Sequence, residues 1–72
     1  MFELIDTFNN RTISSHRTVV AAVKASRKHS LLIQRANGQN SYIPKEIVEV
    51  IKGKKFPVDD IVLMDVEREI YG

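Results

Sequence analysis

Residues 14–43 read SSHRTVVAAVKASRKHSLLIQRANGQNSYI, and the central elements of the predicted fold lie in this stretch. The short hydroxyl side chains of Ser14, Ser15 and Thr18 are candidate N-caps, because they can accept the free amide protons that open a helix. From about His16 to His29 the apolar residues fall on one side of a helical wheel and basic residues fall on the other. The first half of the stretch therefore predicts a helix with one packed face and one basic face.

The second half of the stretch predicts a β-hairpin. Asn37-Gly38 lies between the extended runs LLIQRA and QNSYI, and this pair favours a two-residue type I′ turn. Such a turn sets Arg35, Asn40 and Tyr42 on one face of the hairpin and Leu32 on the other. We expect the small aliphatic face to pack against the helix, which leaves Arg35 and Tyr42 outward. The reverse assignment of the two faces is the alternative.

Two further strands are predicted before this stretch. Residues 2–8, FELIDTF, hold aromatic and aliphatic residues suited to a strand, and Asn9-Asn10 supplies a turn. The segment Arg11 to Ser14 is expected to return beside the first strand. The sequence thus predicts an α+β fold, a small antiparallel sheet of two β-hairpins with the helix 16–29 packed on one face.

The C-terminal part predicts one or two short helices. Pro44 fits the first turn of a helix over residues 44–52 that ends at Gly53, although the β-branched content makes a strand the alternative. Residues 53–57, GKKFP, read as a short basic linker. In residues 58–72 the apolar positions follow a helical period, with an edge strand as the alternative.

Composition excludes several classes of protein. The chain has 72 residues and no cysteine, so disulfides, zinc-finger spacings and thiol catalysis are excluded. We expect one small domain over residues 1–72. The N-terminus MFELID has no basic n-region, and the longest apolar run, Ile61 to Met64, is far shorter than the roughly 20 residues of a membrane helix. A cytoplasmic protein that does not enter a membrane is the expectation.

Charge is segregated along the chain. Seven basic residues and no acidic residue lie between Thr7 and Lys45, whereas residues 58–72 hold five acidic residues and one arginine. Such asymmetry is typical of contact with an acidic partner such as nucleic acid. The alternative is internal compensation, in which the acidic segment folds back on the basic part and neutralises it.

Catalytic chemistry finds little support. The triplet Ser14, Ser15 and His16 has no carboxylate near it in sequence to orient the histidine. His16 and His29 are thirteen positions apart, so a helix does not bring them to one face as metal ligands. Glycine-rich phosphate loops are missing too. We therefore expect no enzyme activity, no metal site and no cofactor.

Two groups of residues remain as candidate binding sites. The start of the predicted helix could hold an anion through its free amide protons and the side chains of Ser14, Ser15, Arg17 and Thr18. A cationic and aromatic surface would combine the helix with the hairpin; its members are Arg17, Lys24, Lys28, Arg35, Asn40 and Tyr42. Cations attract a phosphate backbone, and an exposed aromatic ring can stack on a base.

The sequence favours a small interaction or oligomerisation module, because one face of a small sheet is left without a helix to cover it. Its partner would be another protein or a second copy of the chain. The alternative is a module that binds RNA or single-stranded DNA through the basic residues 11–45.

Overall fold

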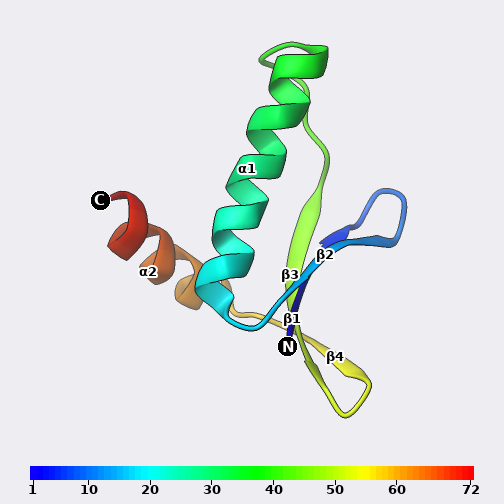
Figure 1. Cartoon of the computed structure of the whole chain (residues 1–72), viewed down its shortest axis with the longest axis vertical. Helices are drawn as coiled ribbons and strands as arrows, with labels where there is room; N and C mark the ends of the chain where they lie inside the picture. The colour runs from blue at the N-terminus through cyan, green and yellow to red at the C-terminus, as the bar shows by residue number, and fades with distance from the viewer.

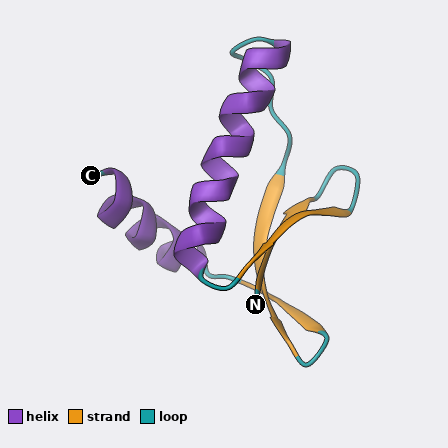
Figure 2. Ribbon diagram, in the orientation of Figure 1, coloured by secondary structure: helices purple, strands orange, loops and turns teal.

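The computed structural model describes residues 1–72 as a four-stranded antiparallel sheet with two helices (Figure 1). Its elements are β1 (Phe2–Asp6), β2 (Arg11–His16), α1 (Val19–Asn37), β3 (Lys45–Ile51), β4 (Lys54–Pro57) and α2 (Asp60–Tyr71). The strand order is β2-β1-β3-β4, so β1 and β3 are central. Figure 2 shows both helices on the same side of the strands. The predicted α+β class is confirmed.

The N-terminal hairpin forms as predicted. β1 pairs with β2 in the register Leu4 to Ser14 and Asp6 to Arg11, with an irregularity between Leu4 and Ile5. Asn10 adopts a positive φ of 54°, which asparagine tolerates better than most residues. β2 continues to His16, so it takes in residues that were expected to open the helix.

α1 begins directly after Thr18, one of the candidate N-caps, and ends far beyond His29, the predicted end of the helix. The Thr18 hydroxyl accepts a hydrogen bond from the Ala21 N–H at 3.1 Å. The helix then runs for 19 residues to Asn37, where the Gly38 N–H donates to the Gln34 carbonyl at 2.8 Å. Gly38 has a φ of 102° and ends the helix as a C-cap.

The predicted hairpin over residues 31–43 is therefore wrong. Residues 31–37 are helical, and residues 38–44 form an irregular segment that returns along α1 (Figure 1). The run LLIQRA consists of good helix formers that extend a helix already begun, whereas no neighbouring strand supports them as an extended run. A glycine after such a run is as typical of a helix C-cap as of a hairpin turn.

The second hairpin lies further along the chain. The helix prediction for residues 44–52 is wrong and its strand alternative is correct, because β3 pairs with β1 on one side and with β4 on the other. Ile47 and Val48 are both buried, at 6% and 5% exposure. Adjacent strand residues point to opposite faces, so a strand can bury both. Lys52 and Gly53 have φ values of 51° and 79°, as the two central residues of a type I′ turn require. Residues 54–57, expected as a linker, form β4.

α2 confirms the helix predicted in residues 58–72. The Asp59 carboxylate caps it by accepting from the Ile61 N–H at 2.9 Å. Its inner face contributes Leu63, Val66 and Ile70, which pack against the core cluster.

The core is small. Leu4 of β1, Ala22 and Val23 of α1 and Ile47 of β3 form one buried cluster between the sheet and the helices. Val48 is the fifth buried apolar residue. Twelve large apolar side chains stay exposed, more than twice as many as are buried. The chain therefore leaves much apolar surface uncovered.

Candidate interaction surfaces

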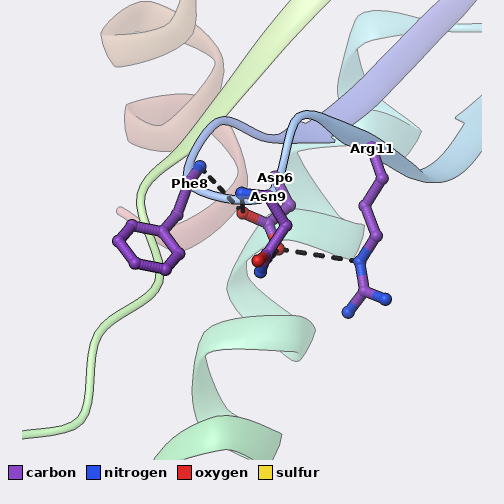
Figure 3. Close-up of polar contacts among 4 residues, drawn as sticks. All are labelled: Asp6, Phe8, Asn9 and Arg11. Atoms are coloured by element: carbon purple, nitrogen blue, oxygen red, sulfur yellow. Dashed lines mark hydrogen bonds and ion pairs between the residues drawn. The ribbon is translucent and has the colours of Figure 1, made fainter.

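The loop between β1 and β2 is built around one buried carboxylate (Figure 3). Asp6 is 1% exposed and accepts hydrogen bonds from the Phe8 N–H at 2.9 Å, the Asn9 N–H at 3.0 Å and the Asn9 side-chain amide at 2.9 Å. The Arg11 Nε lies 3.7 Å from its second oxygen. The bonds from Asn9 are the main reason that the pKa of Asp6 is below its ordinary value of 3.8. Held in this way, the loop presents the Phe8 ring outward.

Two basic side chains, Lys45 and His29, lie near this carboxylate. Lys45 is the β3 partner of Asp6, and its Nζ donates to the Ser30 hydroxyl at 2.8 Å and the Ile43 carbonyl at 3.4 Å. Burial lowers the pKa of Lys45. Burial first, and the charge of Lys45 next, lower the pKa of His29, whose Nδ1 is buried without a hydrogen-bond partner. The hydrogen bond from Lys45 to Ser30 links the start of β3 to α1. No cluster of three or more potential metal ligands forms in the structure.

The basic residues of α1 form a continuous stripe. Lys24, Lys28 and Arg35 lie within about 40° of one line on the helix, over about 17 Å of its length. All three are exposed, and Arg17 is exposed just before the helix. Arg35 joins the others because the helix continues through residues that were expected to form a hairpin. We call Arg17, Lys24, Lys28 and Arg35 the basic stripe.

Tyr42 and Asn40 do not belong to the basic stripe. Both are exposed in the irregular segment 38–44, and the Tyr42 ring lies 5.9 Å from the Lys45 Nζ. This segment packs against the side of α1 that carries Ile33 and Gln34, away from the stripe. The predicted surface is thus split between two sides of the helix.

The predicted anion site at the helix N-terminus is not assembled. Ser14 and Ser15 lie in β2, and the Ser14 hydroxyl is hydrogen-bonded to the His16 Nε2 at 2.8 Å. The Thr18 hydroxyl is used as the N-cap of α1. Only Arg17 and Thr18 flank the helix start, so the four residues do not converge.

α2 packs beside α1 without neutralising it. The Arg27 guanidinium lies 4.1 Å from the centre of the Tyr71 ring, a cation–π contact between the two helices. The two ion pairs of the chain are Arg11 with Asp6 and Lys55 with Glu3, and neither involves α2. The acidic residues of α2 and the basic stripe therefore carry unpaired charge.

α1 extends past the sheet at its C-terminal end (Figure 1), and exposed apolar side chains lie there on two sides of the helix. Residues 30–44, which comprise the last turns of α1 and the returning segment, are here called the arm. Leu31, Leu32 and Tyr42 are 48%, 51% and 77% exposed on it. Lys28 and Arg35 flank the two leucines on the helix.

Comparison with protein-family models, with curated proteins and with solved structures finds no match. Neither helix combines the length and the apolar character that crossing a membrane requires.

Proposed function

We propose that this chain is a non-enzymatic interaction module that docks through the arm. The excess of exposed over buried large apolar side chains supports this reading. Clustered exposed apolar side chains are typical of interaction surfaces, because the burial of apolar area is the main favourable contribution to protein association. On the arm Leu31 and Leu32 adjoin, and Tyr42 lies on the returning segment.

The charge around Leu31 and Leu32 indicates what kind of partner surface would fit them. An apolar side chain flanked by Lys28 and Arg35 fits an apolar patch with acidic residues at its rim. The chain offers such a patch on the outer side of α2, where Ile61 and Met64 are 68% and 58% exposed beside Asp65. A second copy therefore has the required chemistry, and self-association is the first test.

Sedimentation velocity tests this proposal between about 5 and 500 µM at low salt, a range that covers weak association. We expect the mass to rise with concentration, and the double substitution Leu31→Lys and Leu32→Lys to abolish the rise. Phe56→Lys is the control, because Phe56 is 49% exposed but lies on β4, away from the arm. A monomer at every concentration, combined with no adduct from a photo-crosslinking residue at position 31 in cells that express the chain, contradicts the proposal.

A nucleic-acid partner is the second candidate, and the unpaired basic stripe favours it. Cations spaced along one helix face can follow a phosphate backbone. Changing Arg17, Lys24 and Lys28 to Gln is expected to reduce the slope of log K against log salt by about 2 to 3, since each contact contributes about 0.7 to 0.9. Tyr42→Ala tests base stacking separately. The absence of binding to RNA, single-stranded DNA and duplex DNA at about 100 µM protein ends this candidate.

A further inference from the structure

A cleft of about 520 Å³ lies where the sheet, α1 and α2 meet. Its floor is apolar and consists of Leu4, Val23, Ile47, Val58 and Leu63. The cleft lies on the inner side of α1, whereas the exposed leucines of the arm are on its outer side. It is therefore a separate surface from the one that the proposed function uses.

One wall of the cleft is an open strand edge. β4 pairs with β3 only between Val48 and Ile51. One further bond follows, from the Val58 N–H to the Ile47 carbonyl at 3.0 Å, and the chain then turns into α2. The part of β3 that precedes Ile47 is bonded to β1 on one side and has no strand on the other.

The hydrogen-bond pattern shows which backbone groups this leaves free. Successive residues of an antiparallel strand direct their N–H and C=O groups to alternate sides. The Pro44 carbonyl accepts from the Thr7 N–H, and the Val50 N–H donates to the Met1 carbonyl. The backbone N–H and C=O groups of the even-numbered residues of this strand therefore point to β1. Lys45 consequently directs its N–H and C=O to the open side, where neither group has a backbone partner.

The rim of the cleft is acidic. Glu46, Asp60 and Glu67 line it, and none of them forms an ion pair. Asp59 also lines the cleft, but its carboxylate caps α2. The one cation of the lining is Lys45, whose Nζ is bonded to Ser30 and to the Ile43 carbonyl. An occupant with positive charge is therefore complementary to the cleft, and a nucleic acid is not.

We propose that this cleft binds an extended peptide of alternating apolar and basic residues, which adds to the open edge of β3 in line with β4. The peptide backbone pairs with the free N–H and C=O of Lys45. Side chains of a strand alternate between two faces, so apolar residues enter the floor of Leu4 and Ile47, above which Glu67 of α2 adds negative charge, while basic residues on the other face meet Glu46. The open edge from Lys45 to Ile47 spans about 7 Å.

A short synthetic peptide tests this directly. The chain has no tryptophan, so the fluorescence of a blocked Lys-Val-Lys-Trp-Lys-Val peptide reports its binding without background. We expect saturable binding that weakens about tenfold or more when Glu46 and Glu67 are both changed to Lys. Glu69→Lys is the matched control, because Glu69 is exposed on the same helix but does not line the cleft. Its effect is expected to stay below about twofold, the size of a screened long-range charge effect.

A second peptide separates strand addition from attraction of charge. N-methylation of the residues that face β3 removes the backbone donors and keeps the charge, so we expect about tenfold weaker binding to the unmodified protein. In an amide NMR titration the largest shifts are expected at Lys45 and Ile47. Equal binding of both peptides, or shifts confined to the outer edges of β2 and β4, would overturn the proposal.

The outcome is distinguishable from that of the proposed function. Leu31→Lys with Leu32→Lys is expected to leave peptide binding unchanged, since both residues lie outside the cleft. Failure of the peptide to bind, together with self-association that Glu46→Lys abolishes, would assign the cleft to a second copy and overturn the peptide proposal, because Glu46 lies on β3 and not on α2.

Discussion

Replacing Leu4 with alanine tests whether the fold is centred where the structure places it. Leu4 is fully buried on β1, between Ile47 of β3 and the inner face of α1. β1 is paired with β2 on one side and with β3 on the other, so it cannot shift to fill the cavity that the substitution leaves. Leu32→Ala makes the same chemical change on α1 at a side chain that is 51% exposed.

The two substitutions are expected to differ strongly in cost. A buried leucine replaced by alanine loses about 2 to 5 kcal/mol of unfolding free energy. A chain of 72 residues is stabilised by about 4 to 11 kcal/mol in total, so Leu4→Ala removes a large share. A loss of about 3 kcal/mol lowers the melting temperature by about 12 to 24 °C. Leu32→Ala should cost about 1 kcal/mol or less, because half of the side chain is already in water and alanine favours helix.

Urea unfolding followed by circular dichroism measures both values with one protocol. A hairpin over residues 31–43 would pack Leu32 against the core, so it predicts similar losses for the two variants. The helix predicts at least a twofold difference in unfolding free energy between them. A loss at Leu4 below about 1 kcal/mol, or an equal loss at Leu32, would refute this placement of the core.

Three further substitutions probe single residues. The pKa of Asp6 is below 3.8, so the contribution of its carboxylate to the stability of the fold is present above about pH 4 and is lost as the pH falls through the folded-state pKa. The substitution Asp6→Asn should remove this acid dependence of the urea midpoint. The pKa of His29 is below 6.5, so stability should fall as the pH drops from 6.5, and a slope that persists in His29→Gln counts against this assignment. Gly38→Val should cost about 1 to 3 kcal/mol, because a φ of +102° strains a β-branched residue; an unchanged urea midpoint would contradict the C-cap.

Local signals predicted the two ends of the fold. The first hairpin follows from a β-prone run before Asn9-Asn10, and α2 follows from a helical period after Asp59. Thr18 was among the candidate caps of α1, and the buried Ala22 and Val23 lie on the face expected to pack. Each of these features depends on residues close together in sequence, which is why pattern alone was sufficient.

The centre of the chain could not be predicted in this way, because two physical signals compete there. Asn37-Gly38 satisfies a hairpin turn and a helix end equally well, and the choice depends on whether LLIQRA continues α1. The spacing of Ile47, Val48 and Ile51 also fits both a helix and a strand. Only the pairing of β3 with β1, 39 to 47 positions away in sequence, decides in favour of the strand.

The candidate surfaces divide along the same line. Arg17, Lys24 and Lys28 of the basic stripe were predicted from helical periodicity, whereas Arg35 was expected beside Tyr42 on a hairpin; the longer helix places Arg35 on the stripe and leaves Tyr42 on the other side of α1. The Asp6 loop could have been recognised, because an aspartate shortly before Asn9-Asn10 is a common turn signal. The cleft beside β3 had no local signal, since its lining comes from five elements that meet only in the folded chain.

The unpaired charges explain why the two proposed surfaces cannot exchange partners. Internal compensation predicts ion pairs between α1 and α2, yet their polar contact is Arg27 on the Tyr71 ring. The basic stripe on the outer face of α1 is therefore free to bind a partner, and so are Glu46 and Glu67 at the acidic rim of the cleft. A partner of the arm must be acidic and a peptide in the cleft must be basic, because like charges brought together cost free energy. Opposite charge reversals at the two surfaces thus separate the two proposals in one set of variants.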